Sequence, residues 1–287
     1  MLFFGNKRAR NGEGAAAAVR FLEAAGMEVK SPPHRKRADV SDAIREHAGE
    51  ADAVVVAGGD GSVNAAAGAL IETGLPVGII PMGTANDLAR TLGLPTDPEA
   101  AVRVIAAGRR RAIDVGTAND HFFFNVASVG LAARVARDLE GGNKKHLGVL
   151  AYGAAAARLV ATAHPIWAEL ETGGGIDRVR TMQISIGAGR HYGGGLTIDE
   201  DARPDDGKLR VVSLELDNWW ELLPLVPALL SGRTHDREGV RAFSTDRLVV
   251  RTKRTEDVDL DGDLLTTTPV TFGIRHEAVE VFVAPPG

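Results

Sequence analysis

The N-terminal part of the chain alternates short apolar runs with segments whose apolar residues recur at helical spacing. The apolar runs, which we predict as buried strands, are residues 2–4, 27–30, 53–57 and 77–81. The helical segments are residues 14–25, 39–48, 63–72 and 86–92. Strands that are apolar throughout are buried on both faces, and alternation with helices places them in a parallel sheet that helices cover. We therefore expect an α/β domain.

The pattern changes near residue 113, after which apolar and polar residues alternate along short runs. Examples are HFFFNVAS, KLRVVSLEL and AVEVFVAP, and glycine-rich turns separate such runs. A period of two with frequent turns predicts a mostly antiparallel β-sandwich. Two helical segments, residues 144–163 and 219–231, interrupt it. We predict two domains that join near residues 114–120.

Composition narrows the range of functions. The 287 residues are 44% hydrophobic and 25% charged, as in globular proteins, and the absence of cysteine excludes disulfides and cysteine-ligated zinc. A net charge of −5 gives no indication of nucleic acid as a partner. No apolar run reaches the roughly 20 residues of a membrane span, and the apolar start is too short for a signal-peptide core. We expect a cytoplasmic protein with no transmembrane segment, which meets any lipid at a membrane surface.

The stretch VVVAGGDGSVN ends a predicted strand in a glycine turn. Glycines 58, 59 and 61 let backbone N–H groups approach an anion, and such turns lie where parallel sheets bind ligands. Asp60 can cap the following helix, bind a ribose or base, or face a cation on the phosphates. The alternative is a tight strand-to-helix connection without a ligand.

A second polar turn follows the strand at 77–81. It supplies Gly83, the hydroxyl of Thr84, and Asn86 and Asp87 at the start of the next helix. Successive parallel strands end at the same sheet edge, so the two turns together predict a phosphate or nucleotide site. Other nucleotide-binding motifs are not found. The sequence has no GxxxxGK[ST] motif, and we interpret the GxGxxA-like residues 12–17 as a helix start. There is also no GxSxG or HExxH motif.

Several blocks along the chain carry a resemblance to a known family. They are GGDGSVN (58–64), PMGTANDLAR (81–90), IDVG (113–116), NVASVG (125–130), GGGLTIDEDARPDDGKLRVV (193–212) and DGD (261–263). The chain thereby resembles the diacylglycerol kinase catalytic family, particularly its small bacterial lipid kinases. GGDGS alone also suits phosphofructokinases and NAD kinases, whereas GTANDLAR and DDGKL favour the lipid kinases.

The resemblance implies a fold and a nucleotide site. It implies an ATP-binding α/β domain over 1–117, completed by a returning strand within 277–287, and a β-sandwich lipid-substrate domain over 118–276, with a cleft between them. The family's N-terminal NPxSG-like motif reads GNKRARNG here, without its proline and serine. The residues that the resemblance assigns to ATP, together with the polar groups of the second turn, are Asn6, Ser31, Gly58, Gly59, Asp60, Gly61, Ser62, Val63, Asn64, Gly83, Thr84, Asn86 and Asp87.

Acidic residues are the candidates for phosphoryl transfer, which needs a base near the acceptor hydroxyl and Mg²⁺ on the phosphates. In VDLDGDLLT, alternation predicts Asp261 and Asp263 on one side of an extended chain, although DGD is also a common hairpin turn. The resemblance makes Asp261 the general base and Asp263 its partner or the base itself. It places Asp114 and Asp60 in the acidic network around the catalytic Mg²⁺.

A structural Mg²⁺ is also implied by the resemblance, in the loop ARPDDGKL. Its ligands would be the carboxylate of Asp206 and the carbonyls of Arg203 and Lys208, since hard cations take oxygen ligands. A polar turn with solvated carboxylates is the alternative. The segment NWWELLPLVPALL (218–230) is either a helix packed on the sandwich or a membrane-interface element.

The leading hypothesis is an ATP- and Mg²⁺-dependent kinase that converts diacylglycerol to phosphatidate at a membrane surface. Alternatives are a kinase for a sphingoid base, polyprenol or phosphatidylglycerol, and a nucleotide-binding regulator that lost catalysis. Nucleic acid is not expected as a partner, and both a monomer and a homodimer stay open.

Overall fold

The computed structural model describes residues 1–5, 12–33, 36–37, 39–140, 162–189, 191–192, 196–197, 203–231 and 237–285. The chain forms two compact units. The first comprises Met1–Val115 and Arg275–Gly287, and the second Gly116–Tyr192 and Leu196–Ile274. Among the described residues, no helix is long and apolar enough to cross a membrane.

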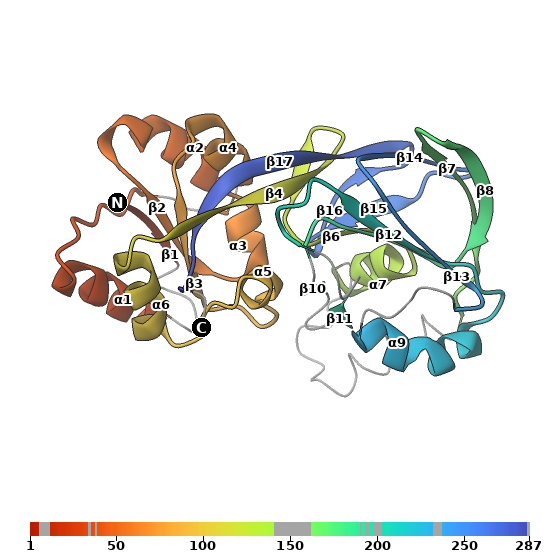
Figure 1. Cartoon of the computed structure of the whole chain (residues 1–287), viewed down its shortest axis with the longest axis horizontal. Coiled ribbons are helices and arrows are strands. Elements are labelled where there is room, and N and C mark those ends of the chain that lie inside the picture. Colours follow the sequence, from red (N-terminus) through yellow and green to blue (C-terminus); the bar gives the residue numbers. More distant parts are fainter. Residues whose placement is uncertain are drawn as a thin grey trace. The chain divides into compact units, whose positions relative to one another are not determined.

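A parallel sheet forms the centre of the first unit (Figure 1). Its strands, in spatial order, are β1 (Leu2–Gly5), β2 (Val54–Gly58), β3 (Val77–Pro81) and the C-terminal part of β17 (Val270–Phe282). Leu2 pairs with Val54, Val54 with Val77, and Val77 with Val281, each in parallel register. These valines and Leu2 are buried, so the apolar runs have the pattern of a sheet covered on both faces. The predicted α/β domain is confirmed.

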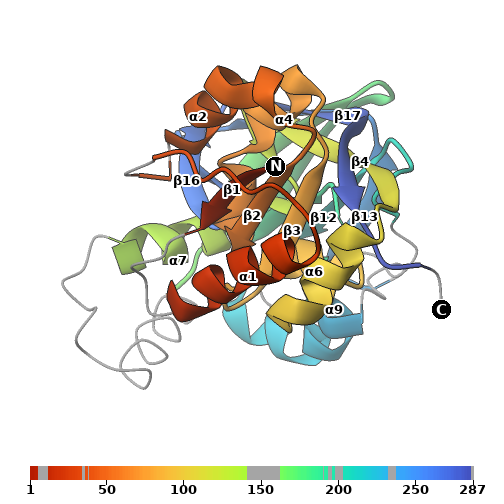
Figure 2. The same ribbon diagram turned by 90° about the vertical axis from the view of Figure 1, so that its left-hand side faces the viewer.

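Helices cover both faces of this sheet, as Figures 1 and 2 show. One face carries α1 (Gly12–Ala24) and α6 (Pro98–Ala106), and the other carries α2 (Asp39–His47), the short 3₁₀ helix η1 (Ala48–Glu50) and α4 (Ala67–Thr73). Two shorter helices directly follow strands: α3 (Asp60–Asn64) follows β2, and α5 (Asp87–Thr91) follows β3. The turns that precede them are therefore the first backbone beyond each strand end.

Two predicted elements of this unit differ from the structure. The single helix expected over 63–72 is divided into α3 and α4. The strand expected over 27–30 is reduced to one bridge between Lys30 and Leu2. Pro32 and Pro33 follow that bridge, and because proline has no N–H to donate, they cannot extend the pairing.

Helix α6 begins with a side-chain cap that gives a stability prediction. Asp97 Oδ2 accepts the N–H of Ala100 at 2.8 Å, and Pro98 occupies the first helical position. Asp97→Ala removes that acceptor, so we expect the free energy of unfolding to fall by about 0.5–2 kcal/mol in urea titrations. Asp97→Asn retains an oxygen that can cap and should keep most of the stability. Equal losses in both variants would contradict the capping role.

The second unit consists mainly of two antiparallel sheets. One contains β5 (His121–Phe123) paired with β4 (Arg110–Ala118), and the N-terminal part of β17 followed by β14 (Arg247–Thr252), β7 (Ile166–Thr172) and β8 (Gly175–Thr181). The other has the order β13 (Val240–Thr245), β12 (Leu209–Leu214), β9 (Gln183–Gly187), β6 (Val126–Gly130), β15 (Asp257–Leu260) and β16 (Asp263–Thr267). A separate short pair is formed by β10 (His191–Tyr192) and β11 (Leu196–Thr197).

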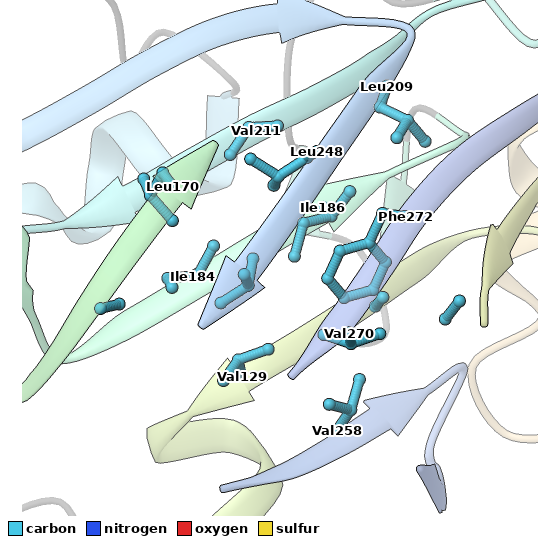
Figure 3. Close-up of a cluster of buried hydrophobic side chains, with 14 of the residues drawn as sticks. Val129, Leu170, Ile184, Ile186, Leu209, Val211, Leu248, Val258, Val270 and Phe272 are labelled. Atoms are coloured by element: carbon cyan, nitrogen blue, oxygen red, sulfur yellow. The ribbon is translucent and has the colours of Figure 1, made fainter. Parts of the chain in front are cut away.

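The core of the second unit lies between these sheets (Figure 3). Alternate residues of each strand point inward, so that Ile184 and Ile186 of one sheet meet Leu248 and Phe272 of the other. Phe272 also packs edge-on against Phe123, with ring centroids 6.4 Å apart. This arrangement confirms the predicted β-sandwich.

Helices cover the outer face of the six-stranded sheet. They are α7 (Leu131–Glu140), the 3₁₀ helix η3 (Trp219–Leu225) and α9 (Val226–Ser231). The helix predicted over 219–231 is thus 3₁₀ in its first half, where Pro224 cannot donate to an α-helical ladder. The helix predicted over 144–163 lies almost entirely outside the described residues.

Candidate active site

The two glycine turns touch each other at one edge of the parallel sheet. Gly58 at the end of β2 pairs with Pro81 at the end of β3, and Met82 donates its N–H to the carbonyl of Gly58 at 3.0 Å. A Cβ on Gly59 would lie 2.9 Å from the Cα of Gly83, and a Cβ on Gly83 only 2.5 Å from the Cα of Gly59. Backbone contact therefore requires glycine on both sides.

Asp60 links the two turns and does not cap its own helix. Gly59 is the N-cap of α3, and Asp60 is the first residue of that helix. The Oδ1 atom of Asp60 instead accepts the N–H of Leu88 in α5 at 3.0 Å. Of the alternatives raised by the sequence, the capping role within its own helix is wrong, because the side chain reaches the N-terminus of the neighbouring helix.

Asn86 fixes the shape of the second turn. Its backbone is left-handed, with φ of 52°, and its side chain bonds Gly83 twice. Gly83 donates its N–H to Asn86 Oδ1 at 2.9 Å, and Asn86 Nδ2 donates to the Gly83 carbonyl at the same distance. Each polar atom of the amide thus makes one hydrogen bond within the turn, and these two bonds fix the backbone between Gly83 and Asn86.

The remaining candidate nucleotide residues divide by exposure. Thr84 is exposed, whereas the side chains of Val63 and Asp87 are buried at 2% and 5% exposure. The Oδ1 atom of Asn64 is buried and has no hydrogen-bond partner among the described residues. A buried acceptor without a protein donor is uncommon, and this one lies directly after the first glycine turn. Either a polar ligand or an ordered water would satisfy this atom.

Two candidates lie apart from the paired turns or cannot be placed. Ser31 is exposed and follows Lys30, which bridges to β1 at the edge of the strand order, away from β3. Asn6 lies outside the described residues. The turns Gly58–Asn64 and Gly83–Asp87 are therefore the part of the predicted set that the structure brings together.

The acidic DGD sequence forms a hairpin turn. Leu260 of β15 pairs with Asp263 of β16, which leaves Asp261 and Gly262 as a two-residue loop with φ of 52° and 95°. Positive φ at both loop residues is the requirement of a tight hairpin turn with the twist of the sheet. The prediction that Asp261 and Asp263 lie on one side of an extended chain is wrong, because the chain reverses between them.

The Asp261 carboxylate is held by three backbone donors. Its Oδ2 accepts the N–H of Phe124 at 2.7 Å, and its Oδ1 accepts those of Asn125 and Val126 at 3.0 and 2.9 Å. These bonds engage both oxygens of the carboxylate and fix the side chain against residues 124–126. Sequence reasoning included this segment among the resembling blocks as NVASVG but did not anticipate its role as a donor loop.

A second carboxylate supports the same hairpin. Asp259 is 8% exposed, and its Oδ1 accepts the N–H of Gly262 at 3.2 Å. The alternation of VDLDGD contains this residue, but only the hairpin geometry shows that its side chain turns back onto the loop.

Asp114 has protein partners that the sequence did not indicate. Its side chain is fully buried, and its Oδ1 accepts the N–H of Glu277 at 2.8 Å and lies 2.8 Å from Nδ1 of His276. Within the described ranges, no group of three or more His, Cys, Asp or Glu residues is arranged to hold a metal ion. The assignment of Asp114 to a Mg²⁺ network therefore stays a prediction.

Asp206 is paired with a cation of the protein itself. Its Oδ2 lies 2.5 Å from Arg210 NH2, and its Oδ1 accepts the N–H of Lys208 at 3.1 Å. The loop thus offers one carboxylate whose charge a guanidinium already balances, with the carbonyls of Arg203 and Lys208 as the other expected ligands. A structural cation at this loop stays a prediction as well.

Comparison with known proteins relates both units to described families. Residues 1–118 match the family model of the diacylglycerol kinase catalytic domain, and residues 125–283 match that of the YegS C-terminal NAD kinase beta sandwich-like domain. A YegS-like lipid kinase of Pseudomonas fluorescens is 30% identical over 285 residues, which cover 98% of this chain and 94% of the relative. The diacylglycerol kinase of Bacillus subtilis is 27% identical over 270 residues, with 93% and 89% coverage.

Solved structures share the fold. The crystal structure of a Bacillus anthracis protein described as a diacylglycerol kinase superposes with a TM-score of 0.84 at 22% identity. The match covers 99% of this chain and 96% of that protein. At this identity the likeness establishes the architecture of the two units.

Proposed function

The chain belongs to the lipid-kinase family that joins a diacylglycerol kinase catalytic domain to a YegS-type C-terminal domain, and from this premise we propose that it transfers the γ-phosphoryl group of ATP to a lipid hydroxyl. The observation that carries the proposal is the contact between the Gly59 and Gly83 turns, joined by the bond from Leu88 to Asp60. Two glycine turns at the carboxyl edge of a parallel sheet present backbone N–H groups to an anion.

The first unit is proposed to hold the nucleotide. ATP bound with Mg²⁺ supplies the phosphoryl group and the neutralising charge for its transfer. The residues that would hold it are those of the turn Gly58–Ser62 through their backbone, with Thr84 offering an exposed hydroxyl and Asn64 Oδ1 a buried acceptor. The carboxylate and amide oxygens near the turn fit a hard cation such as Mg²⁺.

Asp60 allows the cation and the hydrogen bond to be tested separately. Asp60→Asn keeps an oxygen that can accept the Leu88 N–H but removes the negative charge. If the charge faces a cation, the Mg²⁺ concentration for half-maximal activity should rise several-fold while the melting temperature stays nearly constant. Asp52→Asn, which changes an exposed carboxylate in the loop before β2, is the matched control. An unchanged Mg²⁺ requirement would mean that Asp60 acts only by accepting the hydrogen bond from Leu88.

The second unit is proposed to supply the proton acceptor from the DGD hairpin. Three N–H donors fix Asp261 and engage both of its carboxylate oxygens, whereas Asp263 begins β16 across the turn. We therefore infer that Asp263 takes the proton from the lipid hydroxyl and that Asp261 positions the hairpin. This proposal keeps the acidic pair of the resemblance and gives each of the two carboxylates one role.

Diacylglycerol is the proposed acceptor, with a sphingoid base, polyprenol and phosphatidylglycerol as competing lipids. Incubating the protein with γ-labelled ATP, Mg²⁺ and each lipid in mixed micelles tests this directly. The proposal is supported if label enters phosphatidate faster than any other product. If label enters another lipid faster, that lipid is the acceptor instead of diacylglycerol. Tight ATP binding without transfer to any lipid would instead favour a regulator that has lost catalysis.

A further inference from the structure

The segment formed by η3 and α9 has apolar side chains both on the side that packs against the sheet and on its exposed surface. On its inner side, Leu225 is 8% exposed, and Trp219 and Leu222 pack on the cluster that includes Met182 and Leu214. On its outer side, Trp220, Leu223 and Leu230 are 54%, 61% and 54% exposed. We call this outer side the ridge; it consists of Trp220, Leu223, Pro224, Pro227 and Leu230.

The ridge differs from ordinary exposed apolar residues by its concentration. Half of the exposed large hydrophobic side chains of the described chain lie within these eleven residues, 220–230. Trp167 and Ile176, by contrast, lie in β7 and β8 directly opposite Arg180 and Glu171. Isolated apolar residues need no explanation, but a concentration of exposed apolar side chains on one element marks an interaction surface.

We propose that the ridge docks into the surface of a lipid bilayer; this rests on the proposed function. A lipid kinase must reach an acceptor that resides in a bilayer, and none of the described helices is long and apolar enough to cross one. A surface element can supply the contact, and the ridge combines the tryptophan and leucine side chains that membrane-surface elements use. Tryptophan prefers the membrane–water boundary, and leucines beside it enter the acyl region.

Charge decides which kind of bilayer the ridge fits. From Asp217 to Ser231 the chain has two acidic and no basic residues, and Asp217 is paired with Arg180 at 2.5 Å. Because the segment has no basic residue, it offers no electrostatic attraction to anionic lipid headgroups. A zwitterionic bilayer requires no such attraction and is therefore the surface that this segment fits. Binding through the ridge should therefore depend on apolar insertion and change little between low and high salt. Figure 1 shows α9 on the outside of the second unit, away from its core.

The test compares two variants of the full chain on phosphatidylcholine vesicles that contain diacylglycerol. Trp220→Ser with Leu223→Ser removes the aromatic and aliphatic centre of the ridge, and Trp167→Ser removes an equally exposed tryptophan elsewhere. We expect the double variant to lose tenfold or more in vesicle partitioning by co-sedimentation at either salt concentration, and the control to retain it. Melting temperatures and circular dichroism establish that both variants are folded.

Further readouts separate the possible outcomes. In the unaltered protein, brominated lipids should quench tryptophan fluorescence, and the double variant should show much less quenching. Equal partitioning of all three proteins, or no binding by any, overturns the proposal. A dimer by light scattering that the double substitution dissociates, with vesicle binding unchanged, would assign the ridge to a second copy of the chain and also overturn it.

Kinase assays keep this proposal distinct from the proposed function. On a short-chain, water-soluble diacylglycerol the double variant should be as active as the unaltered protein, while activity on vesicles falls with partitioning. If the unaltered protein phosphorylates no lipid but binds vesicles through Trp220 and Leu223, docking is supported and the proposed function is overturned.

Discussion

The Asp263→Asn protein is expected to lose about 10²–10⁴-fold in kcat, the range that a positioned general base contributes. Its ATP affinity and melting temperature should stay close to those of the unaltered protein, because the substitution changes one atom of a residue at the start of β16. Steady-state transfer of labelled phosphate to diacylglycerol measures kcat, and titration calorimetry with ATP measures the ATP affinity.

Asp261→Asn should behave differently, and the comparison makes the assignment testable. An asparagine has one oxygen where Asp261 uses two, so its amide nitrogen would face a backbone donor among Phe124, Asn125 and Val126. We expect a loss of about 1–3 kcal/mol in unfolding free energy together with lost activity. An inactive Asp261→Asn protein of unchanged stability, beside a fully active Asp263→Asn protein, would return the role of base to Asp261.

Gly83→Ala is the second substitution with a large expected effect. The added Cβ would lie 2.5 Å from the Cα of Gly59 and 2.8 Å from Asn86 Oδ1, and neither neighbour can yield without moving a turn. Overpacking of this kind costs about 1–3 kcal/mol, and displaced N–H groups no longer converge on phosphate. We expect the Kd for ATP to rise tenfold or more, with a corresponding loss of kcat/KM.

Gly49→Ala provides the control for that substitution. Gly49 lies in η1 of the same unit, and a Cβ there would have no atom within 4 Å. This variant should bind ATP as the unaltered protein does. An unchanged Kd in Gly83→Ala, measured by the same titration, would show that the contact between the turns has no part in nucleotide binding.

Local sequence patterns predicted the elements that depend on neighbouring residues. The apolar runs at 53–57 and 77–81 became adjacent parallel strands, because a strand without polar positions is stable only inside a covered sheet. The glycine turns were visible as well, since glycine marks backbone that a side chain would obstruct. At the DGD segment, where prediction failed, the cause was again local: the DG loop reversed a chain that its alternation had predicted as extended.

Sequence by itself therefore determined the two fold classes, the positions of the two glycine turns and the acidic residues proposed to act in the chemistry. Only the tertiary structure decided which groups those carboxylates meet. Asp60 bonds a donor 28 residues away, and Asp261 bonds donors 135 to 137 residues away. Periodicity and turn propensity act over a few neighbours, whereas these bonds exist because folding brings distant backbone to the same place. The proposed division of roles between Asp261 and Asp263 rests on those bonds, and the exposure of the ridge depends on how η3 packs on the sheet.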